Sequence, residues 1–158
     1  MLGSIQVVYT EKDGKLGYEY SFEDYIIKGY SGQDNVQVGA VVSTIITRIK
    51  LTKPKIKSII FQSDNASCFA SQELIPFIHH INTQMRDDRD DSVQVTRWLF
   101  TEEQTGRGRL DTHFSFLNIK FNSYVEYSND MVSEDNIFQA MTHREGVTGT
   151  TAILLNCS

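Results

Sequence analysis

The sequence predicts an α/β domain in which helices pack against a mixed β-sheet. The chain opens with two strand-like segments around an Asp-Gly pair, which is the signal of a tight β-hairpin. From residue 36 onward, segments with apolar residues at three- and four-residue steps alternate with short apolar runs, as helices alternate with strands. The predicted order is β-β-α-β-α-β-α-α(-β), and a hairpin followed by alternating helices and strands gives a mixed sheet.

The hairpin is predicted from two strand-like segments and the turn between them. Ile5–Tyr9, with the sequence IQVVY, is typical of a strand, and Leu16–Phe22 alternates as a returning strand does. Residues 11–15 form the turn, with Asp13-Gly14 at its centre. Asp13 is therefore interpreted as a turn residue.

The next segment, Val36–Lys50, is predicted to be an amphipathic helix. Ser31 or Asp34 is placed to cap its N-terminus, and Pro54 ends it. Its β-branched residues lower the intrinsic helix propensity, so packing must supply the difference. The apolar residues at helical spacing form one face: Val38, Val41, Val42, Ile45, Ile46 and Ile49.

The remaining elements follow from similar patterns. Ile56–Phe61 is an almost continuous apolar run, as expected for a central strand that is covered on both faces. The later predictions are a helix over Ser71–Met85, a strand over Val93–Phe100, a helix marked by Leu110, Phe114, Leu117, Phe121 and Tyr124, a helix from its cap Ser133 through Met141, and a short final strand over Thr150–Leu155.

Composition narrows the function classes. The 158 residues suffice for one domain with a real core, and no apolar run is long enough to cross a membrane. The net charge of −5 argues against a broad basic surface that coats DNA, so nucleic-acid binding would depend on local patches or divalent metal ions. Two cysteines, Cys68 and Cys157, make neither a disulfide framework nor a zinc set, which favours a reducing intracellular setting.

An acidic-polar cluster, Ser63-Asp64-Asn65, stands where the apolar run ends. A carboxylate at the end of a buried strand is held by a rigid scaffold and faces an open edge, where metal-dependent phosphoryl-transfer folds place an acid. Asp64 is therefore a candidate metal ligand, and the alternative is a cap for the helix that follows. Asn65 is a candidate contact to nucleic acid or to metal-bound water, and the alternative is a turn residue.

A second unusual segment precedes the third predicted helix and runs from Gln104 to His113. Its Gly-Arg-Gly-Arg core, with Arg107 and Arg109, can close backbone around a phosphate with two guanidinium groups as clamps, or can be a flexible basic loop. Asp111 is a candidate metal ligand, and the alternative is a cap for the third helix or a favourable charge at its N-terminus. His113, two residues later, is a weaker candidate for nucleic-acid contact or catalysis.

These two segments together resemble the RNase H-like catalytic core of DNA transposases of the DDE type. Residues 63–69, with the sequence SDNASCF, look like the SDN-containing fourth strand of cut-and-paste transposase cores. Residues 104–111, with the sequence QTGRGRLD, look like the H-G-K-G-x-x-D pattern that follows the fifth strand in several transposon-derived families. The resemblance covers roughly Ile5 to Tyr124 and implies a single RNase H-like domain over residues 1–158.

The resemblance also implies a chemistry. Two metal ions, Mg²⁺ or Mn²⁺, would be held by Asp64 and Asp111 and would stabilise both the attacking and the leaving oxygen of a phosphodiester. The two acids are 47 positions apart (111 − 64) and would have to converge in the fold. Asn65, Arg107, Arg109 and His113 would contact DNA, and the protein of a transposable element would act in the nucleus.

One acid of the family pattern has no counterpart. The family carries it on the first strand, whereas the opening strand here, Ile5–Tyr9, has no carboxylate and matches the second strand by element count. Asp13 lies 51 residues before Asp64 (64 − 13) but falls in the turn, and Glu102 and Glu103 are alternative third acids. Either the core is N-terminally truncated and lacks its first strand, or its lineage has lost the catalytic acid, and both alternatives predict a catalytically incomplete core. The sheet edge left open by a missing first strand favours pairing into a homo-oligomer.

Two other functions remain open. The missing acid and the acidic net charge favour a non-catalytic, domesticated module that binds nucleic acid or protein. An RNase H-type nuclease acting on RNA is a weaker alternative. Base stacking is conceivable for Trp98, Phe100 and the hairpin tyrosines, but their alternation along strands favours packing within the sheet: Tyr9, Tyr18, Tyr20 and Tyr25.

Overall fold

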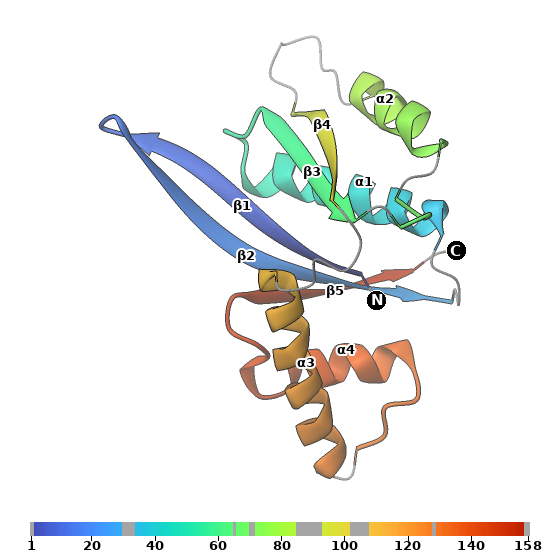
Figure 1. Ribbon diagram of the computed structural model, residues 1–158. Helices are drawn as coiled ribbons and strands as arrows, with labels where there is room; N and C mark the ends of the chain where they lie inside the picture. The colour runs from blue at the N-terminus through green and yellow to red at the C-terminus, as the bar shows by residue number, and fades with distance from the viewer. Residues whose placement is uncertain are drawn as a thin grey trace. The chain divides into compact units, whose positions relative to one another are not determined.

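The computed structural model describes residues 2–29, 34–64, 66–69, 72–84, 93–101, 108–127 and 129–156. Figure 1 shows the elements in chain order. They are β1 (Leu2–Lys12), β2 (Lys15–Lys28), α1 (Asn35–Thr52), β3 (Ser58–Asp64), α2 (Leu74–Gln84), β4 (Gln94–Thr101), α3 (Arg109–Glu126), α4 (Glu134–Thr142), the 3-10 helix η1 (His143–Glu145) and β5 (Thr150–Asn156). The α/β class and the predicted order of strands and helices are confirmed, including the final strand.

The strands form two small sheets, and the chain divides into two compact units. Unit 1 comprises residues 1–30 and 107–158, with a three-stranded sheet in the order β1-β2-β5. Unit 2 comprises residues 31–106, with a two-stranded sheet of β3 and β4. The predicted single mixed sheet is therefore wrong for the described strands. The physical reason is that β5 takes the second edge of β2, from Phe22 beside Thr150 to Lys28 beside Asn156. The extent of a single RNase H-like domain over residues 1–158 stays a prediction.

The hairpin of unit 1 has a two-residue turn. β1 and β2 are antiparallel, with an unbroken register from Leu2 beside Tyr25 to Lys12 beside Lys15. Asp13 and Gly14 both have positive φ, at 55° and 71°, which is the conformation of a hairpin turn that follows the right-handed twist of the strands. The interpretation of Asp13 as a turn residue is confirmed.

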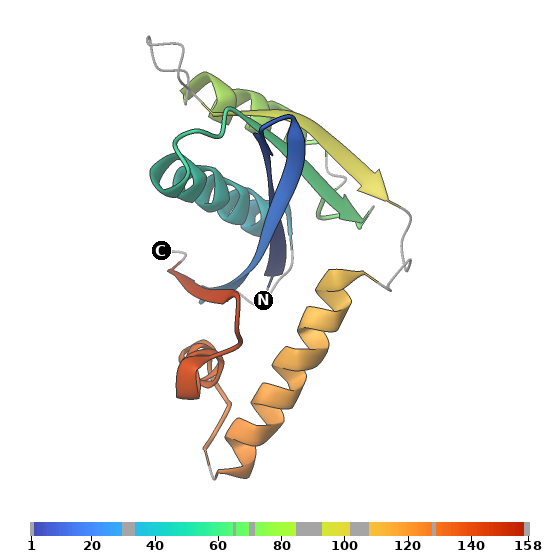
Figure 2. The same ribbon diagram turned by 90° about the vertical axis from the view of Figure 1, so that its left-hand side faces the viewer.

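The core of unit 1 lies between one face of the sheet and the helices α3 and α4. Ile26 of β2, Leu117 of α3 and Met141 of α4 are 2%, 1% and 3% exposed and form its centre. Seven partly buried residues surround them: Phe114, Phe121, Ile137, Phe138, Val147, Ala152 and Leu154. Figures 1 and 2 show that the turn end of the hairpin projects well past α3 and α4, so this core covers only the other end of β2.

Unit 2 is built on α1. Asp34 caps the helix, because its side-chain Oδ1 accepts the backbone N–H groups of Val36 and Gln37 at 3.1 Å each. The predicted apolar face is buried, with Val38 and Ile46 each 1% exposed, and the helix ends at Thr52, two residues before Pro54.

The strands of unit 2 are parallel and joined by α2. The expectation that the first of them is covered on both faces is wrong, because Ile60 is 55% exposed whereas its neighbour Ile59 is 8% exposed. One face of the β3–β4 sheet is therefore exposed, and it carries apolar side chains such as Ile60. Across the described ranges, no helix is long and apolar enough to span a membrane.

Candidate functional site

Asp64 is the last residue of β3, and its carboxylate is exposed. Its Oδ1 accepts the backbone N–H of Ala66 at 3.2 Å, which closes a local turn. It does not cap α2, which begins ten positions later (74 − 64) at Leu74. Because β3 and β4 are parallel, Asp64 lies beside Thr101 at the carboxyl ends of both strands. This edge is where open α/β sheets bind ligands, and the second oxygen of Asp64 accepts no hydrogen bond from the described residues.

Asp111 stands at the N-terminus of α3 in unit 1. Its Oδ2 accepts the backbone N–H of Gly108 at 3.0 Å, and its negative charge lies where the helix dipole favours it. The capping alternative is thus confirmed for Asp111. Asp64 belongs to unit 2 and Asp111 to unit 1, so their convergence on one pair of metal ions stays a prediction.

The other predicted site residues have different environments. Asn65, Arg107, Glu102 and Glu103 lie outside the described residues. Arg109, at the start of α3, is exposed, and its guanidinium lies over the ring of Tyr20 at 4.5 Å. This contact holds a positive charge beside an aromatic ring on the hairpin.

His113 is buried, 2% exposed, and hydrogen-bonded to Asp24, an acid that was not among the predicted site residues. Its Nε2 lies 2.7 Å from Oδ2 of Asp24, which is 0% exposed in the middle of β2. Phe22 stacks on the imidazole, with ring centroids 4.2 Å apart and planes at 9°. The structure thus gives His113 an intramolecular partner, and its contact with nucleic acid stays a prediction.

The second oxygen of Asp24 has no hydrogen-bond partner among the described residues. Burial raises the pKa of the Asp24 carboxyl, and the hydrogen bond and charge of His113 oppose that rise. Gly3, on β1, lies directly against this oxygen: a Cβ at position 3 would be 2.9 Å from Oδ1 of Asp24 and 2.7 Å from Cζ of Phe114. The pair is therefore enclosed by close packing as well as by its own hydrogen bond.

The sequence carried one signal for this pair. Asp24 directly precedes the apolar run Tyr25-Ile26-Ile27, and a carboxylate next to such a run needs a partner if the strand is buried. The alternation that predicts a strand over Leu16–Phe22 ends before Asp24, whereas β2 continues to Lys28. Extending the strand would have placed Asp24 on the same face as Phe22 and Ile26.

The hairpin carries an open aromatic face toward its turn. The paired residues Tyr9 and Tyr18 are 65% and 59% exposed, with ring centroids 6.5 Å apart, and Tyr20 is 52% exposed beside Val7. By strand alternation these residues share the face of Phe22 and Asp24. Tyr25, which is 0% exposed, is packed in the core as expected, whereas the other three tyrosines contact neighbouring rings on the sheet but are not buried.

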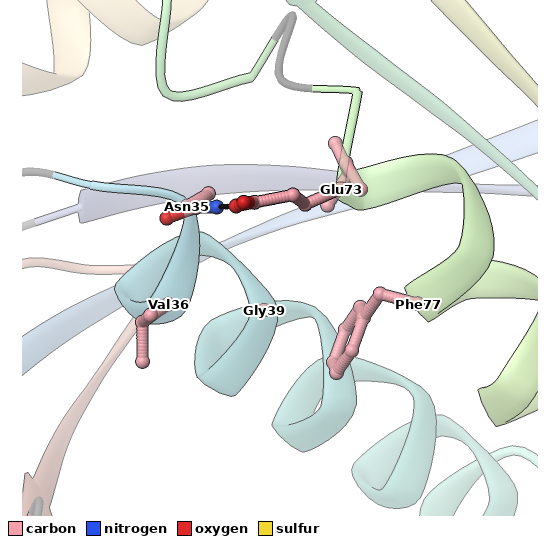
Figure 3. Close-up of a pocket in the computed structure, with 6 residues that line it drawn as sticks. Asn35, Val36, Gly39, Glu73 and Phe77 are labelled. Atoms are coloured by element: carbon pink, nitrogen blue, oxygen red, sulfur yellow. Dashed lines mark hydrogen bonds between the residues drawn. The ribbon is translucent and has the colours of Figure 1, made fainter.

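Unit 2 has a small pocket of about 250 Å³ at the starts of α1 and α2. Figure 3 shows the ring of Phe77 directed toward Gly39, and a Cβ at that glycine would be 3.1 Å from the ring. The side-chain amide of Asn35 donates a hydrogen bond to Glu73, which ties the two helix starts together at the rim. The other lining residues are Val36 and Leu74, so the pocket is mainly apolar.

The predicted metal cofactor has no assembled ligand set within the parts of the chain that are described, where no three His, Cys, Asp or Glu side chains group together. Mg²⁺ or Mn²⁺ binding therefore stays a prediction centred on Asp64. Comparison with known proteins identifies no relative, since no protein-family model, no curated protein and no solved structure matches this chain.

Proposed function

We propose that this chain is a fragment of a transposase-derived catalytic core whose ancestral activity was metal-dependent cleavage and transfer of DNA strands. In this proposal Asp64 is a ligand for Mg²⁺ or Mn²⁺, Asp111 is the second inherited acid, and the fragment is incomplete as an enzyme. Its working location would be the nucleus, where its DNA partner is found.

The position of Asp64 carries the proposal. It is exposed at the carboxyl end of β3, beside the end of a parallel strand, where a bound ligand is reached by residues from both strands. Hard cations such as Mg²⁺ prefer carboxylate oxygens, and the local hydrogen bond from Ala66 engages only Oδ1 of Asp64. Glu102 and Glu103, which follow Thr101 in the sequence and lie outside the described residues, stay the alternative third acids.

Calorimetric titration with Mn²⁺ tests this role. The wild-type chain is compared with Asp64→Asn, which keeps an acceptor for the Ala66 N–H but removes the charge. Asp130→Asn, which changes an exposed acid distant in sequence from both motifs, is the matched control. We expect binding that Asp64→Asn reduces at least about tenfold, as loss of a charged ligand does, and that Asp130→Asn leaves unchanged. Heat of binding that is equal in all three proteins would reject a metal site at Asp64.

Asp111→Asn separates one shared site from two independent acids. If both carboxylates hold the same pair of ions, this substitution weakens Mn²⁺ binding together with Asp64→Asn, and the double variant is no weaker than the poorer single variant. Additive losses would mean that the two acids bind ions separately, which contradicts a two-metal centre.

The open aromatic face favours a second candidate, a non-catalytic module that binds single-stranded nucleic acid. Tyr18 and Tyr20 present exposed rings from a rigid hairpin, and Arg109 adds a cation beside them. Bases stack on such rings with little sequence preference, and an arginine can contact the phosphate backbone.

Fluorescence anisotropy with a labelled oligonucleotide tests the second candidate without metal. Tyr18→Ala would weaken binding by about 5- to 100-fold if a base stacks on this ring. Leu51→Ala, which truncates an exposed apolar residue of unit 2, should have no effect. Equal weakening by both substitutions, or no binding by the wild type at low salt, would contradict the stacking surface.

A further inference from the structure

The strand β1 forms an outer edge of the unit 1 sheet. In the order β1-β2-β5 it pairs with β2, and no further described strand pairs with its other side. The direction of its backbone groups follows from one hydrogen bond. Phe22 donates its backbone N–H to the carbonyl of Gly149 at 2.9 Å, so the even-numbered residues of β2 near that point face β5.

The odd-numbered residues of β2 consequently face β1. In the observed register Ser21 lies beside Gln6 and Glu19 beside Val8, so the even-numbered residues of β1 complete that ladder. The backbone N–H and C=O groups of the odd-numbered residues point away from β2, toward the open edge. These residues are Gly3, Ile5, Val7, Tyr9 and Glu11.

This edge lacks the features with which monomeric proteins protect exposed strands. β1 has eleven residues, no proline and an unbroken register with β2, so it has no bulge. Its charged residues, Glu11 and Lys12, are confined to the turn end. Val7 and Tyr9 are 45% and 65% exposed. A long, regular, apolar edge of this kind is a template for another strand.

We propose that a second copy of this chain occupies the edge, with the two β1 strands antiparallel and Val7 facing Val7 of the partner across a two-fold axis. Odd-numbered residues of one β1 must face odd-numbered residues of the other, because only their backbone N–H and C=O groups point to the open edge. Pairing residue i with residue 14 − i meets this condition and overlaps the whole of β1, from Leu2 to Lys12. Each Ile5 then faces Tyr9, which is a favourable apolar pair. Glu11 faces Gly3 and Lys12 faces Leu2, so no like charges meet.

The partner of this edge is a copy of the chain because the strand is complementary to itself in that register. A symmetric, isologous contact needs one surface that pairs with itself, and residues 2–12 meet that requirement in apolar character and in charge. The paired strands would join two hairpins into one six-stranded sheet and bring their tyrosine faces together. Such a contact lies at the low end of specific interfaces, so we expect a Kd in roughly the micromolar range. The inference does not depend on the metal site or on nucleic-acid binding.

Disulfide trapping tests the register. In an otherwise cysteine-free chain (Cys68→Ala, Cys157→Ser), Val7→Cys places two thiols on facing residues whose Cα atoms lie about 5.5 Å apart, within reach of a disulfide. Tyr9→Cys is the matched control, because facing copies of residue 9 are separated by four residues, about 13 Å along the strands. We expect rapid cross-linking of Val7→Cys, little of Tyr9→Cys, and cross-linking again when Ile5→Cys and Tyr9→Cys chains are mixed.

Charge substitution tests the dimer itself by light scattering. Val7→Lys puts two lysines opposite each other at the axis, and we expect at least a tenfold rise in the dimer Kd with unchanged circular dichroism. Thr10→Lys, which adds the same charge opposite Ser4, should remain dimeric. A wild type that is monomeric well above micromolar concentration, or Val7→Cys cross-linking no faster than Tyr9→Cys, would overturn the proposal. A monomeric wild type would mean that a second copy does not pair with this edge. Equal cross-linking of the two cysteine variants would exclude the register centred on Val7.

Discussion

The two sheets of this protein each carry an aspartate, and the two aspartates have opposite surroundings. Asp24 lies in the middle of β2, is 0% exposed and shares a 2.7 Å hydrogen bond with His113. Asp64 lies at the end of β3 and is exposed, and among the described residues its carboxylate accepts only a local hydrogen bond from Ala66. An acid inside a strand must find its partner within the fold, whereas an acid at a strand end keeps an oxygen for an external ligand. Position along the strand therefore separates an acid with a partner inside the fold from an acid whose proposed partner is an external ligand.

The largest effect should come from removing the partner of the buried acid. His113→Ala leaves the carboxyl of Asp24 buried without its hydrogen bond and removes a ring that stacks on Phe22. We expect a loss of about 3–5 kcal/mol in the free energy of unfolding, measured by urea denaturation at pH 7. His80→Ala, on the exposed side of α2, is the control and should change stability by less than about 0.5 kcal/mol. Similar values for both variants would mean that the buried pair contributes little.

The secondary-structure elements that carry these residues were largely predictable from the sequence. The Asp13-Gly14 turn fixes the hairpin, the spacing from Val38 to Ile49 fixes α1, and Ser133 marks the start of α4 with its Oγ 3.2 Å from the N–H of Asn136. These signals are local, because a turn, a cap and a helical face each depend on residues close together in the chain.

The pairing of distant segments was less predictable. β5 joins β2 across more than a hundred residues, and the bond between Asp24 and His113 spans 89 positions. A single sequence has no local pattern for either. The exposure of the hairpin tyrosines was not predictable for a related reason. Alternation shows which residues share a face of the sheet, but not how far the helices extend over that face. The position of Asp64 at the end of β3 was predictable, because it depends only on where the apolar run stops in the sequence.

Close packing around Asp24 gives the next largest effect. Gly3→Ala would put a Cβ 2.7 Å from the ring of Phe114 and 2.9 Å from Oδ1 of Asp24. Because the ring and the carboxyl are both held in the core, we expect a loss of about 1–3 kcal/mol in thermal or urea unfolding. Gly17→Ala, on the open part of the same hairpin, meets its nearest atom at 3.6 Å and should be neutral or slightly stabilising. The reverse order of stability would show that the enclosure around Asp24 is loose.

The pH dependence of stability should reveal the buried acid directly. Burial, partly offset by the hydrogen bond and charge of His113, raises the pKa of Asp24 above the value of 3.8 expected for an unperturbed aspartate. The folded state therefore binds a proton more tightly than the unfolded chain. The stabilisation from this proton is fully present below the unfolded pKa and is lost as the pH rises through the folded pKa. A tenfold difference in proton affinity corresponds to about 1.4 kcal/mol.

Asp24→Asn isolates this effect, because an asparagine does not titrate and still offers a hydrogen-bond acceptor to His113. From about pH 4 upward, the wild type should lose stability relative to Asp24→Asn, as measured by urea midpoints at a series of pH values. Parallel curves for the two proteins would show that the carboxyl has the same proton affinity in the folded and unfolded states.

The smallest effects should distinguish the two exposed acids from each other. Asp111→Ala removes the acceptor for the N–H of Gly108 and a negative charge from the start of α3, so we expect a loss of about 1 kcal/mol. Asp64→Ala removes only the local bond to Ala66 and should cost less, about 0.5 kcal/mol. Urea unfolding without metal measures both. Adding Mn²⁺ should then stabilise the wild type but not Asp64→Ala, because an ion that binds only the folded state raises its stability. Equal stabilisation of both proteins by Mn²⁺ would place the ion away from the end of β3. Asp64 would then not be a metal ligand, and the exposed aspartate would differ from the buried Asp24 only in its surroundings.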